Sequence, residues 1–474
     1  MNSWANYHQQ LQRRAFLGRA GLGIGSAALS SLLGQDLSAA SGDALPSLPH
    51  FAPKAKRVIF LCMAGGPSHL ETFDYKPKLD ALDGKPMPAS FTDGQPIAQL
   101  QGKELKVQGH LTKFKRYGQS GQYISDFLPH TAKLADDIAV VRSMVTEQIN
   151  HDPAHTFMNT GTAISGRPSM GAWTTYGLGS ETKDLPGFVV LSSVGGRNPQ
   201  PIASRQWSAG FLPSRYQGVQ FNSTGDPVHY VRNPAGISDI QQASLVDTIS
   251  QLDHQRNQLV RDPEIDTRIA AYEMAYRMQS SVPGLVDIAD EPQHVLDLYG
   301  ATPGDGSYAS NCLLARRLAE RGVRFIHLYH RGWDHHGDLA KYMGICSGLT
   351  DRPTWALLTD LKQRGLLDDT LVIWGGEFGR TPMFQGKGEA GRDHHIKGFS
   401  MWMAGGGIKG GVSHGATDEL GYHAVDNVVH VRDLHATMLH QLGLDHNRFS
   451  VPFQGLDMKL TGVDKARVVQ GLLD

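Results

Sequence analysis

The feature that most constrains the fold is a series of six short, continuously apolar segments. Each is rich in β-branched or aromatic residues, and their bounds are Arg57–Met63, Ile138–Arg142, Gly187–Leu191, Val323–Tyr329, Thr370–Trp374 and Phe399–Ala404. Continuous rather than alternating hydrophobicity is typical of strands covered on both faces, as in parallel sheets. Helical patterns at 311–321 and 353–364 lead into the segments at 323 and 370. This order predicts an α/β fold with a doubly wound, mostly parallel sheet and helices on both faces.

The 474 residues suit one large domain or two ordinary ones. Between about 195 and 235 the chain is rich in Gly, Pro, Ser and Asn, which predicts a long excursion over the surface. Residues 240–280 then show a helical pattern. We therefore expect a single domain over 50–465 with a loop-rich and helical insertion at about 195–290.

The first forty residues resemble an export signal. Arg13 and Arg14 precede Phe16, and a weakly apolar stretch follows over 20–33. Paired arginines before a short apolar region are typical of twin-arginine signals, which export folded proteins. The alternative is an amphipathic N-terminal helix, which the glycines between 21 and 25 disfavour. The sequence predicts a signal peptide over 1–40, the twin-arginine translocase as a partner during export, and a periplasmic or extracellular location.

Composition excludes several classes of function. A formal net charge of -1 gives no electrostatic footprint for nucleic acid. Three cysteines are too few for a disulfide scaffold or a cysteine-type zinc ribbon in a chain of this length. The N-terminal apolar stretch is too short and too weakly apolar for a permanent membrane span.

Polar, histidine-rich clusters lie next to five of the six predicted strands. In open parallel sheets, ligands bind beyond the carboxyl ends of the strands, so these clusters are expected to form one site. Their chemically useful members are Ser68, His69, Glu71, Asp74, His151, His155, His330, Arg331, Asp334, His335, His336, Glu377, Arg380, Arg392, Asp393, His394, His395 and Lys397.

Imidazole and carboxylate without thiolate predict a divalent metal site, and two metals fit the same pattern. The residue types favour zinc, manganese, iron or nickel over a soft metal, and calcium is a further candidate. Adjacent histidines point different ways along a backbone, so one residue of the pair 335/336 and one of the pair 394/395 is expected to ligate. The alternative for each histidine alone is a hydrogen-bonded structural role.

Three other motifs carry less weight. His151 and His155 have the spacing of a zincin helix, but Asp152 replaces the glutamate and Pro153 lies between them. The segment 411–415 matches a nucleophile elbow around Ser413, but no apolar strand precedes it and no helix pattern follows. A serine hydrolase using Ser413 therefore stays a minor alternative. Asp433 is predicted to be the N-cap of a helix that begins at residue 434.

The motif layout resembles the alkaline phosphatase/sulfatase superfamily, and within it the sulfatase-like branch called domain of unknown function 1501. The resemblance covers nearly everything after the N-terminal signal. It rests on GGPSHLETFDYKP (65–77), GRPSMGAWTTYGLGSE (166–181), WDHHGD (333–338), GGEFGRTP (375–382), GRDHHIKGFSMWMAGGGIKGG (391–411) and VRDLHATMLHQLGLDH (431–446).

The resemblance also implies roles for site residues. The superfamily's nucleophile position falls on His151, and its late carboxylate ligand on Glu377. The Asp expected after the first strand is replaced by a glycine run, so Asp74 or His69 would substitute for it. The expected metal ligands are Asp74, Asp334, His335 or His336, Glu377, Asp393, and His394 or His395; Arg380 and Lys397 would hold an anion, and His151 or His155 would transfer a proton.

Without a hydroxyl at position 151, three mechanisms stay open: attack by a metal-bound water, attack by His151 or Ser68, or no catalysis. The first hypothesis is an exported, metal-dependent hydrolase of a phosphate or sulfate ester, with a small-molecule or glycan substrate. The second is a periplasmic binding or assembly protein that kept the fold without activity.

Overall fold

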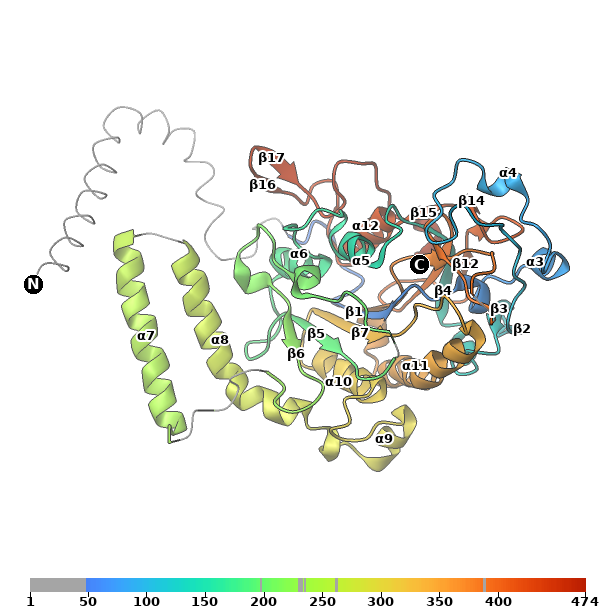
Figure 1. Ribbon diagram of the computed structural model, residues 1–474. Helices are drawn as coiled ribbons and strands as arrows, with labels where there is room; N and C mark the ends of the chain where they lie inside the picture. The colour runs from blue at the N-terminus through green and yellow to red at the C-terminus, as the bar shows by residue number, and fades with distance from the viewer. Residues whose placement is uncertain (1–47, 197, 229–232, 234–235, 261–262, 387–388) are drawn as a thin grey trace, which may run out of the picture. The chain divides into compact units, whose positions relative to one another are not determined.

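The six apolar segments all become strands of one nine-stranded sheet in the computed structural model (Figure 1). The structure describes residues 48–474 apart from 197, 229–232, 234–235, 261–262 and 387–388, so the predicted signal peptide over 1–40 lies outside the described residues. The strands of the sheet are β1 Arg57–Ala64, β4 Ile138–Val145, β5 Phe188–Ser192, β6 Val219–Phe221, β7 Phe325–Arg331, β8 Thr370–Gly375, β11 Phe399–Ala404, β12 Ser413–His414 and β15 Val429–His430.

The sheet has the order β12-β4-β11-β8-β1-β7-β5-β6, with β15 also paired to β4. Strand β1 lies at its centre with all eight residues buried, and it pairs in parallel with β7 and β8. Strand β11 is antiparallel to both β4 and β8. The predicted α/β class with a mostly parallel sheet is confirmed. Continuous hydrophobicity identified β1 correctly because both of its faces are covered.

Helices cover both faces of the sheet (Figure 1). On one side lie α5, α6 and α12, and on the other lie α10 and α11. The helices are α3 Pro77–Ala81, α4 Ala89–Thr92, α5 His151–Thr160, α6 Met170–Leu178, α7 Asp239–Val260, α8 Pro263–Val286, α9 Gln293–Tyr299, α10 Tyr308–Glu320, α11 Leu339–Gln363 and α12 Val431–Gln441. The short strands outside the main sheet are β2 Phe114–Tyr117, β3 Gln122–Ser125, β9 Gly379–Arg380, β10 His394–His395, β13 Ala416–Thr417, β14 Ala424–Asp426, β16 Val451–Phe453 and β17 Leu456–Met458.

Two predicted helix starts were wrong. Helix α11 begins at Leu339, well before Pro353, which lies inside the helix. A proline usually marks a first turn, but here buried side chains on both sides of Pro353 hold the helix together. Helix α12 begins at Val431 with His430 as its N-cap, and the Asp433 side chain accepts a hydrogen bond from the His430 backbone N–H at 3.0 Å. Asp433 is therefore the third residue of a capping box rather than the cap itself.

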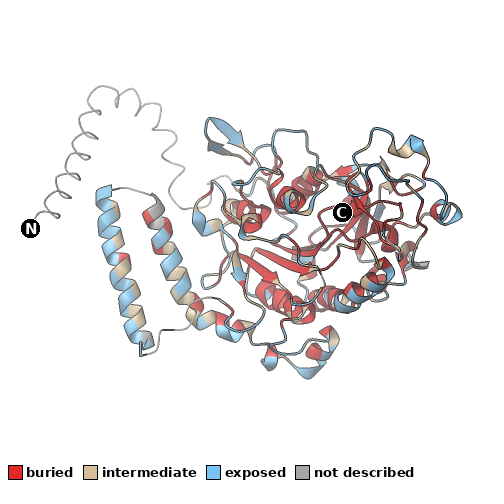
Figure 2. Cartoon of the chain, viewed as in Figure 1, coloured by how far each residue is buried: buried red, intermediate tan, exposed pale blue. Residues whose placement is uncertain are grey.

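Burial is concentrated in the sheet and in the helices packed on it (Figure 2). Helices α7 and α8 pack against each other, and α7 exposes much of its surface, including Leu252 and Leu259. These two helices lie within the region predicted as a loop-rich and helical insertion. Among the described residues, no helix combines the length and apolar character needed to cross a bilayer.

Candidate metal centre

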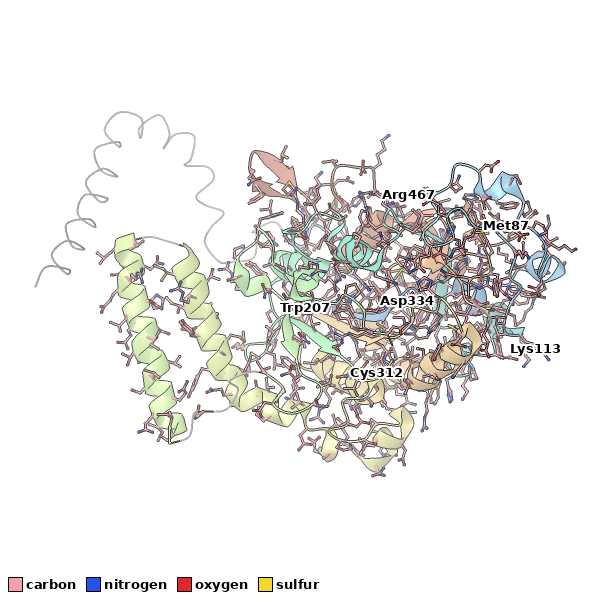
Figure 3. All side chains as sticks on the ribbon, in the orientation of Figure 1. Met87, Lys113, Trp207, Cys312, Asp334 and Arg467 are labelled. Carbon is pink, nitrogen blue, oxygen red and sulfur yellow. The ribbon has the colours of Figure 1, made fainter. Side chains whose placement is uncertain are left out.

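The carboxyl ends of three central strands bring the predicted site residues together. Strand β1 runs into Gly65, β7 leads to Asp334, and β8 leads to Glu377. His151 is the first residue of α5 and lies beside these strand ends. Asp334 is labelled in Figure 3. Parallel strands place their carboxyl ends at one edge, so separated segments of the sequence meet there.

Three imidazoles surround the Asp334 carboxylate. The Nε2 atoms of His336, His151 and His394 lie 2.9, 3.3 and 3.4 Å from Asp334 Oδ1. The Nε2 atoms of His336 and His394 are themselves 3.0 Å apart. We call His151, Asp334, His336 and His394 the histidine cluster. Its ligand atoms all lie within 4.8 Å of one another.

Hydrogen bonds on the far side of each ring fix which nitrogen carries the proton. The Nδ1 atom of His336 donates to Gln385 Oε1 at 2.6 Å, and that of His394 donates to the Ile149 carbonyl at 2.8 Å. These oxygens only accept hydrogen bonds, so each neutral ring carries its proton on Nδ1 and an unshared electron pair on Nε2. Two such Nε2 atoms cannot hydrogen-bond to each other. A cation between them resolves their repulsion.

His151 completes the same pattern. Its Nδ1 donates to Glu377 Oε1 at 2.6 Å, and its buried Nε2 lies 3.3 Å from Asp334 Oδ1. Burial lowers the pKa of His151, but hydrogen bonds to Asp334 and Glu377 outweigh burial and raise the pKa above its usual value. A metal ion at His151 Nε2 would compete with a proton for the same electron pair.

The spacing of the cluster fits a small divalent cation. Tetrahedral ligands at about 2.0 Å from zinc are about 3.3 Å from each other, near the separations around Asp334 Oδ1. Burial raises the pKa of Asp334, but its close contacts with His151, His336 and His394 lower it far more. Arg380 lowers it further, and its Nη2 donates to Asp334 Oδ1 at 2.7 Å. The carboxylate is thus ionised and held in place for a cation. His151, His336 and Asp334 are each partly exposed, which leaves an open side toward solvent.

The second carboxylate, Glu377, has different neighbours. Its oxygens accept backbone N–H bonds from Gly65 and Gly66 at 3.1 to 3.2 Å, in addition to the bond from His151. His155 Nε2 lies 3.4 Å away, and His151, His155 and Glu377 form a second group with metal-ligand chemistry. Burial raises the pKa of Glu377, but His155 and then His151 lower it to about 2. Because its oxygens already accept hydrogen bonds from these N–H groups, the main role of Glu377 is to orient the His151 ring.

Glycine is required at position 65, where the backbone after β1 lies against the backbone of Asp334. Gly65 has φ +121°, and a Cβ there would lie 2.5 Å from the Asp334 backbone nitrogen. Its own N–H donates to Glu377. The glycine run after β1 therefore joins the backbone of one carboxylate to the side chain of the other.

Four predicted ligands make bonds outside the histidine cluster. His335 donates from Nε2 to the Gly332 carbonyl at 2.8 Å, and His395 hydrogen-bonds to the Tyr422 carbonyl. Burial lowers the pKa of each of these rings to about 3. Asp393 accepts backbone N–H bonds at 2.8 and 2.9 Å. Asp74 forms an ion pair with Lys76 at 3.1 Å.

The predicted catalytic residues are also dispersed. The Ser68 hydroxyl donates to Glu71, which is itself paired with Arg392. Arg380 is fully buried, and its other donors bond to backbone carbonyls, including those of Gly65 and Gly66. Lys397 is exposed. Ser413 is exposed on the two-residue edge strand β12.

No pattern in the sequence pointed to the groups that orient the rings. Gln385 lies in a loop between two candidate clusters, and the Ile149 contribution is a backbone carbonyl. Gln99, an exposed residue at the rim, places its amide nitrogen 3.3 Å from His336 Nε2. Amides in loops carry no periodic pattern, so only the three-dimensional structure reveals them.

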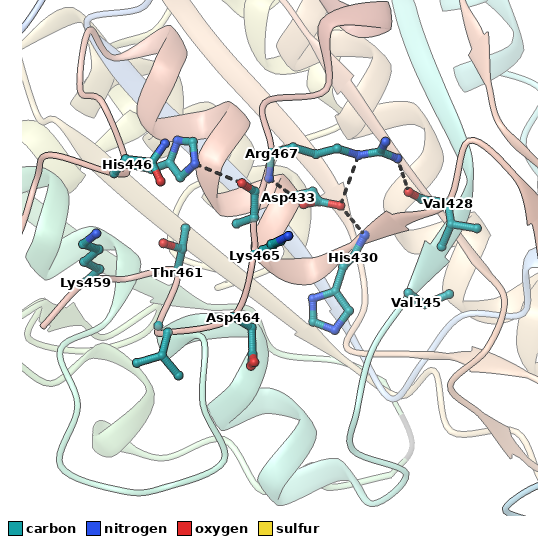
Figure 4. Close-up of a pocket in the computed structure, with 14 residues that line it drawn as sticks. Val145, Val428, His430, Asp433, His446, Lys459, Thr461, Asp464, Lys465 and Arg467 are labelled. Carbon is teal, nitrogen blue, oxygen red and sulfur yellow. Dashed lines mark hydrogen bonds and ion pairs between the residues drawn. The ribbon is translucent and has the colours of Figure 1, made fainter.

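A separate cavity lies away from the histidine cluster. It has a volume of about 700 Å³ and lies beside α12 (Figure 4). Among the polar side chains that line it, Arg467 lies 3.9 Å from the Asp433 carboxylate and donates to the Val428 carbonyl, and His446 hydrogen-bonds to the Ala466 carbonyl. No member of the histidine cluster lines it.

Comparison with known proteins identifies a family. A family model described as "Protein of unknown function (DUF1501)" matches residues 55–473. No curated protein gives a significant sequence match.

Solved structures show more distant likenesses. PsFucS1 sulfatase from Pseudoalteromonas sp. is 12% identical, with 95% of this chain and 76% of that chain covered and a TM-score of 0.36. The phosphonate monoester hydrolase of Agrobacterium radiobacter is 11% identical, with 83% and 74% covered and a TM-score of 0.32. A mutant of TAB5 alkaline phosphatase is 11% identical, with 75% and 92% covered and a TM-score of 0.28. These scores carry no inference about activity.

Proposed function

The chain belongs to the DUF1501 family of proteins of unknown function, and from this premise we propose that it is a metal-dependent hydrolase of phosphate or sulfate esters. One observation carries the proposal: the Nε2 atoms of His336 and His394 face each other at 3.0 Å while both Nδ1 protons are donated elsewhere. This arrangement is stable only with a cation or an extra proton between the rings.

The residues fit such a metal. Three imidazole nitrogens and one carboxylate oxygen supply a complete set of ligands, and a partner orients each ring on its far side. When bound, a divalent metal polarises an ester oxygen and lowers the pKa of a water molecule to near neutrality. Zinc, manganese and the other metals compatible with nitrogen and oxygen ligands are candidates.

The chain's own residues hold the ligands and leave room for the substrate. Arg380 keeps Asp334 ionised, and Glu377 keeps the His151 ring turned toward the cluster. The cluster consists of imidazoles and a carboxylate, so it offers neither hydroxyl nor thiol for attack on an ester. Attack by water is the route these residues support. The choice of phosphate or sulfate esters rests on the motif resemblance to the alkaline phosphatase/sulfatase superfamily.

The same proposal includes export. The paired arginines at 13 and 14 and the apolar stretch after them support a twin-arginine signal over 1–40. The protein would then act in the periplasm or outside the cell, on a small-molecule or glycan ester. Cell fractionation of the full chain with and without Arg13→Lys and Arg14→Lys tests this. Export that is unchanged by the double substitution contradicts the twin-arginine assignment.

Elemental analysis tests the metal centre. In each of two pairs of adjacent histidines, one residue is a proposed ligand and its neighbour is the matched control. His394→Gln and His336→Gln are expected to lose bound metal after dialysis, because each removes a ligand nitrogen. His395→Gln and His335→Gln are expected to keep it, because those rings bond to backbone carbonyls. Metal content that is equal in all four variants would falsify the proposed centre.

Hydrolysis is tested with aryl phosphate and aryl sulfate panels on the metal-loaded protein. Turnover that disappears in His394→Gln and persists in His395→Gln supports the hydrolase. Full metal loading with no turnover on either panel favours the second candidate function, a periplasmic binding or assembly protein. The imidazole at position 151, in place of a nucleophilic hydroxyl, is the observation that supports this alternative.

A further inference from the structure

Arg331 is a cation without a partner beside the candidate metal centre. It is the last residue of β7, half-buried, and its Nε atom is buried. No hydrogen bond or ion pair reaches its side chain from the residues that the structure describes. A partly buried guanidinium is normally paired, because desolvation without a partner costs free energy.

The other arginines near the strand ends have their anions or carbonyls in place. Arg205 pairs with Asp152, and Arg392 pairs with Glu71 at 2.7 Å. Arg380 bonds to Asp334 and to backbone carbonyls. Arg331 thus differs from its neighbours in having its charge free for a ligand.

Arg331 lies on the same face of β7 as Tyr329, whose hydroxyl lies beside Asn159 of α5. Side chains two apart on a strand point to the same side, and the rings of His327 and Tyr329 stack at 4.0 Å. Tyr329 also contacts Trp207, at 6.1 Å between ring centroids. Trp207 and Asp334 are both labelled in Figure 3. Arg331 is the next residue on this face, and it lies at the open end of the sheet.

The loop after β5 ties this position to the cluster. A Cβ on Gly196 would lie 1.9 Å from the Arg331 carbonyl oxygen, so the loop backbone lies directly against it. Two residues later, Asn198 donates from Nδ2 to the Asp334 carbonyl at 2.9 Å. Arg331 and Asp334 are three positions apart in the sequence, which is at most about 10 Å of extended chain.

We propose that Arg331 binds the anionic group of the substrate, a phosphate or sulfate, beside the histidine cluster. The choice of ligand rests on the proposed function. It refines that function, because the residue assigned to bind the anion is now Arg331 rather than Arg380 or Lys397. A guanidinium presents a planar fork of N–H donors that matches the oxygens of phosphate and sulfate in two parallel bonds. The anion neutralises the half-buried charge.

Arg142 supplies a matched control. It is also half-buried with a buried, unpartnered Nε, but it lies on β4. Strands β11, β8 and β1 separate β4 from β7, a distance of about 19 Å at the usual strand spacing. Removing Arg142 changes the net charge by the same amount without touching the strand end.

Calorimetric titration of inorganic phosphate and of sulfate into the zinc-loaded full chain tests the proposal. Arg331→Met is expected to weaken binding by about tenfold or more, the loss typical of a charge-assisted pair of hydrogen bonds. Arg331→Lys is expected to recover part of it, since lysine keeps the charge without the fork. Arg142→Met is expected to bind as the unaltered chain does. Thermal unfolding of each variant checks that the fold is intact.

Three results overturn the proposal. The first two are unaltered binding in Arg331→Met and no binding of either anion by the unaltered chain. Equal weakening by Arg142→Met also overturns it, because the effect would then be one of net charge. Zinc content measured on the same samples separates this inference from the proposed function. A chain that takes up no zinc defeats the metal centre, whereas phosphate binding that still depends on Arg331 upholds the anion site.

Discussion

Asp334 and Glu377 are carboxylates at the ends of the two strands that flank β1, yet their surroundings are opposite in kind. Glu377 is fully buried, and three N–H groups, from Gly65, Gly66 and His151, point at its oxygens. Asp334 is partly exposed, accepts from the Arg380 guanidinium, and faces the Nε2 atoms of three imidazoles whose Nδ1 atoms donate elsewhere. Glu377 is satisfied by N–H donors on several sides, whereas Asp334 has one such donor and otherwise faces ring nitrogens.

This difference assigns the two roles. A carboxylate among N–H donors is satisfied without a metal and serves to orient its neighbours. A carboxylate that faces three ring nitrogens offers, together with them, a set of ligands for a metal cation in addition to its bond from Arg380. His151 joins the two, because its Nδ1 contacts Glu377 and its Nε2 contacts Asp334. Residue type alone does not separate a ligand from the group that orients it; the positions of the protons do.

The largest effect is expected from Asp334→Asn. The substitution keeps the shape of the side chain but removes the only charged ligand of the cluster. Metal affinity should fall by more than about 100-fold, beyond the range typical of partners outside the ligand set. Competition titration with a chromophoric chelator measures it. Asp393→Asn is the control, because Asp393 accepts backbone N–H bonds and should leave affinity unchanged. A Kd equal to that of the unaltered chain would show that Asp334 is no ligand.

Glu377→Gln tests the other side of the comparison. The amide keeps one acceptor but turns an NH₂ group toward N–H donors, so the His151 ring loses its charged partner. Metal affinity should fall by about 10- to 100-fold rather than vanish, as is usual when an orienting partner is lost. The free energy of unfolding should fall by about 1 to 3 kcal/mol for the unsatisfied buried groups. Chelator competition and urea unfolding measure the two effects. Complete loss of metal would instead make Glu377 a ligand.

The fold was largely predictable because the central strands are buried on both faces. Such strands are apolar at nearly every position, and β1 is buried over all eight residues and apolar at each one after Arg57. The helix starts were less accessible, because Pro353 and Asp433 are typical start signals whose use depends on the packing of neighbouring turns. Short strands such as β12 and β15 have two residues each and leave no pattern to detect.

The candidate site was predictable as a region but not as a set of roles. Strand ends located the clusters around Asp334, Glu377 and His394. The sequence could not say that His395 bonds to a backbone carbonyl while its neighbour joins the cluster, because this depends on the twist of a two-residue strand. Nor could it show that Arg380 is committed to backbone carbonyls.

Gln385→Leu tests the weaker orienting partner. Leucine cannot accept the His336 Nδ1 proton, so the ring loses the bond that fixes its tautomer. The loss should be about tenfold, smaller than for Glu377→Gln because Gln385 is uncharged and lies nearer the surface. Gln99→Leu is the comparison: its amide nitrogen only covers His336 Nε2 from the rim, and its removal should not weaken the metal. Equal losses in both variants would mean that the rim amide orients the ring too.

The last prediction concerns a histidine that lies outside the cluster and whose substitution should leave metal affinity unchanged. Burial lowers the pKa of His435 to about 4, and its Nε2 hydrogen-bonds to the Met158 carbonyl at 2.7 Å. Between pH 6.5 and 4 the unfolded chain takes up a proton here that the folded chain refuses, so unfolding becomes easier as the pH falls. Above pH 6.5 this contribution to stability is complete, and below pH 4 it is lost. In metal-free protein, His435→Gln should therefore flatten the pH dependence of the unfolding free energy by up to about 1.4 kcal/mol per pH unit in that window. Urea unfolding at several pH values measures the slope. Metal affinity at neutral pH should be unchanged in His435→Gln, because this ring donates to a backbone carbonyl and lies outside the histidine cluster. A variant that loses metal would show that the metal centre also depends on His435.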